Sequence, residues 1–136
     1  GEQARTTLLQ TKDGQLSDAL VDRACMEEML RLGEESGLEV LQRYGEWTVA
    51  TADLHLAVRA CRAGKNREFY QLSLAPCRSL NVEELTEAAL RGEQELFAFL
   101  ATQPWAEGAQ LLQTSSSAFE RWRDNQAMEL IRPEKY

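Results

Sequence analysis

Apolar side chains in this chain recur every three or four residues, the spacing that stacks them on one face of an α-helix. The two clearest stripes are Val21, Cys25, Met29 and Leu32, and Phe119, Trp122, Gln126 and Leu130, in which Gln126 is the polar exception. No convincing strand pattern competes with them, because alternating runs such as residues 70–75 are too short to pair alone. The pattern therefore predicts an all-α fold.

Helix start and stop signals divide the chain into seven or eight helices, several of them short. Gly64 suits a C-terminal cap, and Asn81 with Glu84, and Ser117 with Glu120, have the capping-box spacing. Residues 1–15, with a turn at Asp13-Gly14, are expected to form a short helix or a frayed arm. The other expected helices cover 16–33, 38–63 with a possible interruption near Gly45, 66–75, 82–90, 93–101, 105–113 and the segment after Ser117.

Length and composition indicate one all-helical domain, a multi-helix bundle covering residues 1–136. The chain has 136 residues and a net charge of −7, and an acidic chain is poorly suited to binding nucleic acid, which requires neutralised phosphates. Its three cysteines form no CxxC pair, which favours a reducing compartment. No apolar run approaches the roughly 20 residues of a membrane helix. We therefore expect a cytoplasmic location without direct membrane insertion.

Catalytic, metal and cofactor sites are not expected. His55 is the single histidine and lacks an HExxH context. The run Ser115 to Ser117 lacks the GxSxG elbow of a hydrolase and is better interpreted as helix capping. Adjacent acid pairs such as Glu83-Glu84 diverge by about 100° on a helix, so they are usually solvated edges rather than acid–base pairs.

Four basic residues, Arg59, Arg62, Lys65 and Arg67, gather around Gly64. A phosphate-binding loop does not fit, because position 59 lacks the required glycine and position 66 is Asn rather than Ser or Thr. Positive charge is favoured at a helix C-terminus, where the macrodipole is negative. The four residues are candidates for contacts with a partner or between helices. The sequence has many helix-packing patterns and no catalytic motif, so the residues alone favour a scaffold or adaptor protein.

Three blocks of the chain resemble a known family. "VATADLHLAVRACRAGKNREFYQLSL" at 49–74 is similar to V-D-L-x-N-L-K-x-x-L-R-x-x-x-x-G-K-x-x-x-F, "ALVDRACMEEML" at 19–30 to A-L-D-R-x-Y-x-E-x-L, and "FERWRDNQAMELIRPEKY" at 119–136 to L-E-R-x-x-D-N-x-L-x-x-x-x-x-x-K-Y. They belong to the C-type central-stalk subunit of A/V-type rotary ATPases and ATP synthases, the relative of the d-type subunit of eukaryotic V-ATPases. The chain departs from the family pattern at Ala50, where the family has Asp, and at Asp53, where it has Asn.

The resemblance implies a non-catalytic, all-helical spacer that couples rotor-shaft subunits to the membrane rotor ring and carries no cofactor. It implies a peripheral place at the membrane, through the ATPase complex that transports ions with ATP consumption or synthesis. The family's chains are longer and built of three helical repeats, so we expect this one to be a piece or short form, with apolar surface through which it can self-associate. An unrelated soluble helical adaptor, or a small enzyme with an acid pair, is the alternative.

Overall fold

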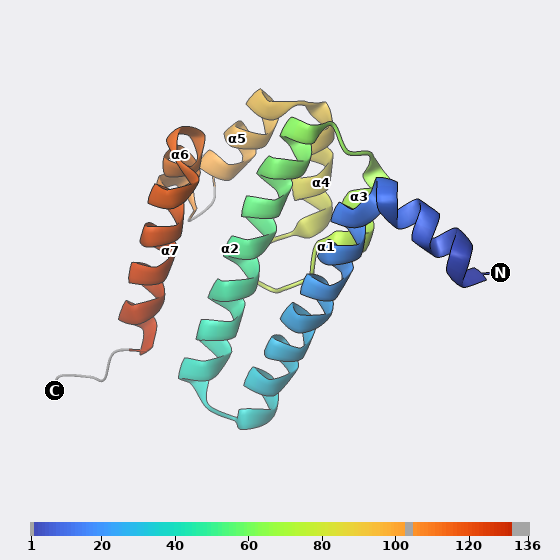
Figure 1. Ribbon diagram of the computed structural model, residues 1–136. Helices are drawn as coiled ribbons and strands as arrows, with labels where there is room; N and C mark the ends of the chain where they lie inside the picture. Colours follow the sequence, from blue (N-terminus) through green and yellow to red (C-terminus); the bar gives the residue numbers. More distant parts are fainter. Residues whose placement is uncertain (1, 103–104, 132–136) are drawn as a thin grey trace, which may run out of the picture.

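A computed structural model describes residues 2–102 and 105–131; for residues 2–16 and 131 it describes the backbone alone. Seven α-helices and no strands occur within these ranges, which confirms the all-α prediction (Figure 1). They are α1 (Glu2–Ser36), α2 (Glu39–Ala63), α3 (Arg67–Ser73), α4 (Val82–Arg91), α5 (Glu93–Ala101), α6 (Ala106–Thr114) and α7 (Ser116–Ile131).

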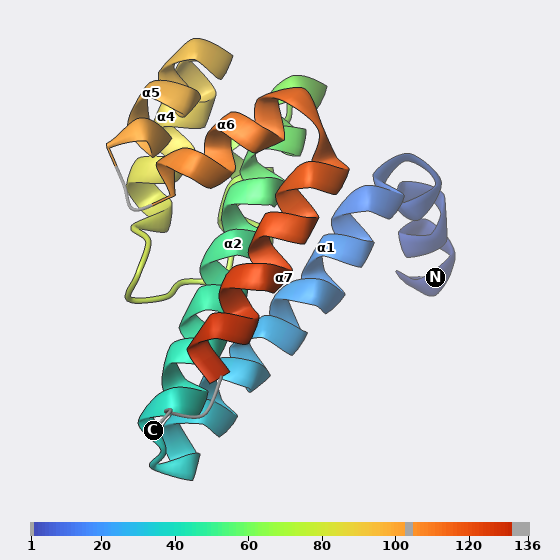
Figure 2. The same ribbon diagram turned by 90° about the vertical axis from the view of Figure 1, so that its left-hand side faces the viewer.

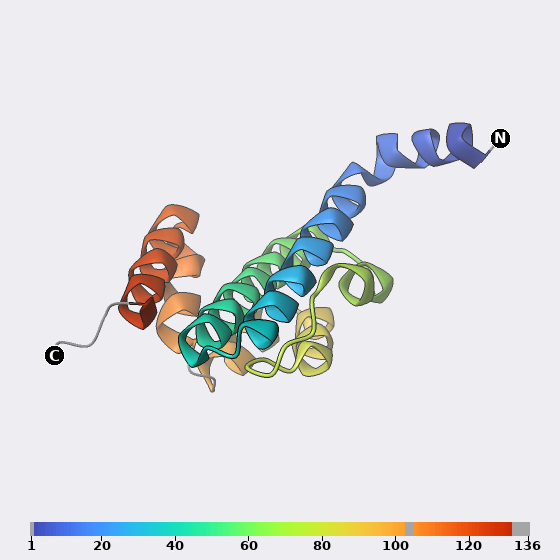
Figure 3. The same ribbon diagram turned by 90° about the horizontal axis from the view of Figure 1, so that it is seen from below.

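Helix α2 is the central element of the bundle. It packs against α1, α4, α5 and α7, while α3 lies between α1 and α4. In Figure 2, α7 runs along one side of α2 and α1 along another, and the view from below in Figure 3 shows the start of α1 projecting away from the other helices. The buried side chains of α2 include Val49, Leu54 and Val58, and the last two belong to the main core cluster.

Close backbone contact joins α1 and α2 into an antiparallel hairpin. A methyl group on Gly33 would lie 3.1 Å from the carbonyl oxygen of Leu41, so the absence of a side chain there lets the helices approach. Gly37 makes the turn with φ of 70°, a backbone conformation that glycine adopts without strain. The hairpin end leaves Leu32, Leu38 and Leu41 exposed.

Most predicted helix boundaries are confirmed to within a few residues, and three details were wrong. The first helix is continuous from Glu2 through Gly14 to Ser36, rather than divided near Asp13-Gly14. Helix α2 continues without interruption through Gly45. Gly45 faces α1, and Met29 of α1 fills the space beside it.

The third error concerns the start of α7. The predicted cap was Ser117, but the cap lies two residues earlier: the Ser115 hydroxyl accepts the amide hydrogen of Ala118, and the helix begins at Ser116. Three consecutive serines offer three possible caps, so sequence spacing alone did not select the right one. The cap at Asn81 is confirmed, since its side chain accepts the Glu84 amide hydrogen at 3.0 Å.

Candidate interaction surface

The basic stretch surrounds the C-terminus of α2. Gly64 has φ of 71°; its amide donates to the carbonyl of Cys61 at 3.1 Å, and the Lys65 amide donates to that of Ala60 at 3.0 Å. This pair of bonds is the Schellman arrangement that closes a helix. Asn66 then caps α3 by accepting the Phe69 amide hydrogen. The glycine therefore ends a helix, and the loop amides serve its caps rather than a phosphate.

Three of the four basic side chains contact neighbouring groups of this chain. Arg62 forms an ion pair with Glu93 of α5, with 3.0 Å between Nη2 and Oε2, and its guanidinium lies 5.9 Å from the centre of the Phe97 ring. Lys65 Nζ lies 5.2 Å from the centre of the Phe69 ring. These contacts connect the end of α2 to α5 and to α3, and both rings offer the face that attracts a cation.

Arg67 of α3 forms an ion pair with Glu87 of α4. This pairing raises the pKa of Arg67 and lowers that of Glu87, because each charge favours the ionised form of the other. Both side chains are about half exposed, and ion pairs at such positions contribute little stability. Their geometric effect is to join α3 to α4.

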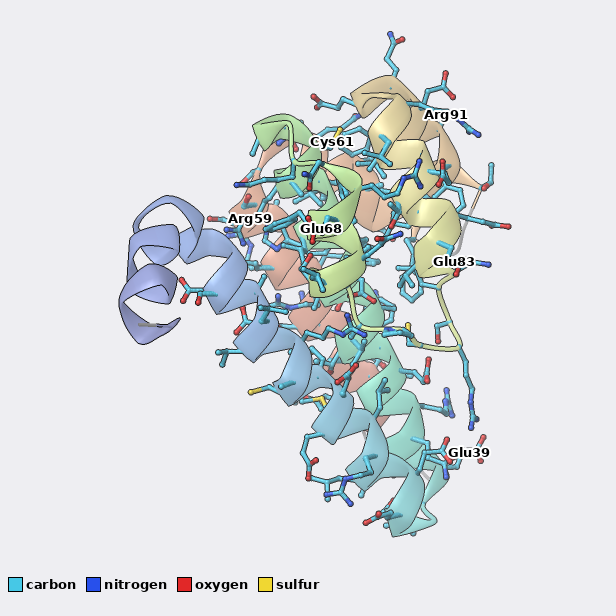
Figure 4. The ribbon with its side chains drawn as sticks, turned by 90° about the vertical axis from the view of Figure 1, so that its right-hand side faces the viewer. Glu39, Arg59, Cys61, Glu68, Glu83 and Arg91 are labelled. Atoms are coloured by element: carbon cyan, nitrogen blue, oxygen red, sulfur yellow. The ribbon has the colours of Figure 1, made fainter. Side chains whose placement is uncertain are left out.

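Arg59 differs from these three, because it makes no ion pair or hydrogen bond within the described part of the chain. It is exposed on the upper half of α2, far from Glu39 at the other end of the helix (Figure 4). Arg59 lines a cleft of about 410 Å³ together with Asp18, Asp22 and Arg123. His55 lies in the same cleft; burial lowers its pKa, and Arg59 lowers it further. Arg59 is therefore the basic residue most available to a partner.

Two acidic side chains of α2 hold the connector between α3 and α4, and sequence reasoning did not identify this role. Asp53 Oδ1 accepts the Ala75 amide hydrogen at 2.9 Å. Glu46 Oε1 accepts the amide hydrogens of Arg78 and Ser79, each at 3.0 Å, and the Ser79 hydroxyl at 2.8 Å. Seven residues separate the two acids, about two helical turns, so they lie on one side of α2.

Asp53 is the more unusual of the two acids. Its side chain is buried, and Oδ2 lacks a hydrogen-bond partner among the described residues. Burial raises the pKa of Asp53 to about 8, although the Ala75 amide and the Arg23 charge act in the opposite direction. Asp53 is the single acidic residue between Val49 and Val58, and this was the signal that the sequence offered.

The three tryptophans meet where α2, α6 and α7 come together. The Trp47 ring centre lies 5.1 Å from those of Trp105 and Trp122, and Trp47 Nε1 donates to the Arg123 carbonyl at 3.1 Å. Trp105 is buried. Trp47 and Trp122 are partly buried and pack against the core, so the three tryptophans act as core anchors.

Neither a metal cluster nor a membrane span occurs within the described ranges. There, no group of three or more histidine, cysteine, aspartate or glutamate residues is arranged to hold a metal ion. Among the same residues no helix combines the length and the apolar character needed to cross a bilayer. The cysteines Cys25, Cys61 and Cys77 are unpaired thiols.

In this bundle, ion pairs join α2 to α5 and α3 to α4. The chain belongs to the ATP synthase (C/AC39) subunit family, whose model matches residues 2–136. It is thus a rotary ATPase subunit, a relative of the d-type subunit of V-ATPases, and this family is one of non-catalytic structural subunits. No curated protein and no solved structure matches the chain.

Proposed function

We propose that this chain is a spacer of the central stalk that couples the rotor shaft to the membrane rotor ring. Its place is at the membrane, peripherally, through the other subunits of the complex. The observation that carries the proposal is the family match over residues 2–136. In this role the chain transmits torque between the two parts of the rotor. It thereby supports ion transport that is driven by ATP hydrolysis, or that drives ATP synthesis, elsewhere in the complex.

The packing of α2 suits a part that must carry load. Close-packed protein interiors have low compressibility and transmit strain, and α2 is surrounded by α1, α4, α5 and α7. The connector that leaves α3 is held to the same helix by Asp53 and Glu46. A displacement of α2 would therefore move its neighbours with it rather than bend a loop.

Of the four basic candidates, we assign partner contact to Arg59. Arg62, Lys65 and Arg67 already engage Glu93, Phe69 and Glu87, so their charges stabilise the contacts between helices. Arg59 makes no ion pair or hydrogen bond with the described residues, and it lines a cleft with Arg123 and with Asp18 and Asp22. An acidic side chain of a stalk subunit is the complementary group.

The spacer role can be tested by capture of the parent protein from gently solubilised source membranes, with its companions identified by mass spectrometry. Rotor-shaft and rotor-ring subunits in stoichiometric yield would support the proposal. Soluble partners alone, or no partners, would contradict it and favour an unrelated helical adaptor.

Arg59→Glu tests the assignment of the contact residue. We expect this variant to recover fewer stalk subunits while its melting temperature stays at the wild-type value. Arg43→Glu is the matched control, since Arg43 is an exposed arginine near the other end of the same helix. Equal recovery by Arg59→Glu and the wild type would show that Arg59 does not contact the partner.

A further inference from the structure

The connector between α3 and α4 is fixed at its two ends and at one point between them. Residues 74–81 belong to no helix, and Figure 2 shows them as an extended loop that reaches the side of α2. At one end Ala75 is 1% exposed and donates its amide hydrogen to Asp53; at the other end Leu80 is also 1% exposed. The four residues from Pro76 to Ser79 span the distance between these two buried anchors.

Little apolar surface fixes these four residues to the bundle. Pro76, Arg78 and Ser79 are exposed, and Cys77 is the member that packs, partly buried, against the core. The Cys77 thiol donates only a long hydrogen bond, with 3.9 Å between Sγ and the Leu80 carbonyl oxygen. A segment with so few buried apolar contacts can open while the rest of the protein stays folded.

One oxygen atom of α2 restrains the middle of the connector. Oε1 of Glu46 accepts the amide hydrogens of Arg78 and Ser79, each at 3.0 Å, and the Ser79 hydroxyl at 2.8 Å. Hydrogen bonds to a carboxylate are stronger than those between neutral groups. Arg78 also pairs with Glu34 of α1, but these two side chains are 76% and 51% exposed, and such pairs contribute little stability. Glu46 is therefore the main restraint between the two anchors.

We propose that residues 76–79 are a strap that opens as a local unit, and that Glu46 is the latch that keeps this strap closed. Opening breaks the three hydrogen bonds to Glu46 and exposes the Cys77 thiol to solvent, while the two buried anchors stay in place. In the closed state burial, together with the charges of Asp53 and Glu46, raises the pKa of Cys77 to about 11, which leaves little reactive thiolate. The strap thus controls access to Cys77, and this role is independent of the spacer role.

The first test is native-state hydrogen exchange of the chain, followed by NMR as urea is raised below the unfolding transition. The dependence of an opening on urea scales with the surface that it exposes. We therefore expect the Arg78 and Ser79 amides to exchange through an opening that urea hardly affects, whereas the Leu54 amide in the core follows global unfolding. A shared urea dependence of these three amides would contradict the proposal, and so would a lack of protection at Arg78 and Ser79.

The second test compares two variants of the latch. Glu46→Ala removes the acceptor oxygen, whereas Glu46→Gln keeps an oxygen that can accept hydrogen bonds; both remove the charge that acts on Cys77. Alkylation by N-ethylmaleimide, mapped by mass spectrometry, should modify Cys77 at least about tenfold faster in Glu46→Ala than in Glu46→Gln, because a larger fraction of the straps is open. Equal rates in the two variants would mean that the charge of Glu46, rather than its hydrogen bonds, controls Cys77, which would overturn the proposal.

Cys61 is the internal control in the same samples. It is a partly buried thiol on α2, outside the strap, so its alkylation rate should be the same in both variants. Parallel acceleration of Cys61 and Cys77 in Glu46→Ala would indicate general loosening of the fold and contradict a local strap. Circular dichroism checks that each variant is folded, and if Glu46→Ala does not fold, the exchange experiment on the unaltered chain decides.

Discussion

Trp122 of α7 lies directly against the α-carbon of Gly108 in α6. A methyl group on Gly108 would lie 2.7 Å from Cη2 and 2.9 Å from Cε3 of the indole, closer than carbon atoms can pack. The indole is in turn fixed by Trp47 and Phe119, whose ring centres lie 5.1 and 5.8 Å away. Helices α6 and α7 can therefore pack this closely only because residue 108 is a glycine.

Gly108→Ala should destabilise the fold by about 1–3 kcal/mol, the usual cost of an extra carbon atom in a packed core. Chemical denaturation measures this change. The matched control is Gly45→Ala, another buried helical glycine, where the new methyl group would have only ordinary contacts, the nearest being the Met29 carbonyl oxygen at 3.6 Å. Alanine is about 1 kcal/mol better than glycine within a helix, so the control should be neutral or stabilising. Similar losses in the two variants would contradict the packing explanation.

Asp53 should make the protein less stable as the pH rises from about 4 to about 8. Burial raises its pKa from 3.8 to about 8, so over this interval the folded state keeps a proton that the unfolded state has released. The free energy of unfolding then falls with pH across the interval and levels off above it.

Asp53→Asn keeps an oxygen that can accept the Ala75 amide hydrogen and removes the titration. We expect the difference in unfolding free energy between Asp53→Asn and the wild type to grow in favour of the variant from pH 5 to pH 8.5, as measured in urea. Other carboxyl groups titrate in both proteins, so the difference isolates Asp53. Parallel pH profiles would show that Asp53 does not titrate in this range.

The Arg62–Glu93 pair should contribute a small, salt-dependent stabilisation of the contact between α2 and α5. Both side chains are more than 40% exposed, so either charge reversal should cost about 0.2–1 kcal/mol. Arg62→Glu should cost more than Glu93→Arg, because it also removes the guanidinium from the Phe97 ring. The double variant Arg62→Glu with Glu93→Arg should recover part of the loss. Additive losses in this double-mutant cycle would mean that the pair does not interact.

The three thiols should react with a disulfide reagent at clearly different rates. Cys25 is exposed, whereas Cys61 and Cys77 are partly buried. Burial raises the pKa of Cys61 and raises that of Cys77 to about 11, which lowers the fraction of reactive thiolate. We expect one fast thiol per chain, absent in Cys25→Ser, and two that react fully only in denaturant. Two fast thiols in the native protein would contradict this expectation.

The helices were predictable because their signals are local. Asn81 and Glu84 lie three residues apart, and Gly64 ends α2 through bonds to Cys61 and to the residue before it. The position of the basic stretch at a helix end followed from the same local rules. The contacts of its side chains could not be predicted from these local rules. Arg62 and Glu93 are 31 residues apart, and only the packing of α5 on α2 brings them together.

By itself the sequence determined the all-helical class, most helix ends and the resemblance to the central-stalk family of rotary ATPases, since periodicity and capping act within one or two turns. Only the tertiary structure decided that Asp53 and Glu46 hold the α3–α4 connector, that Trp122 fills the place of a side chain on Gly108, and that Arg59 keeps its charge available. Those relationships join residues from separate helices, and their distances depend on how the whole core packs.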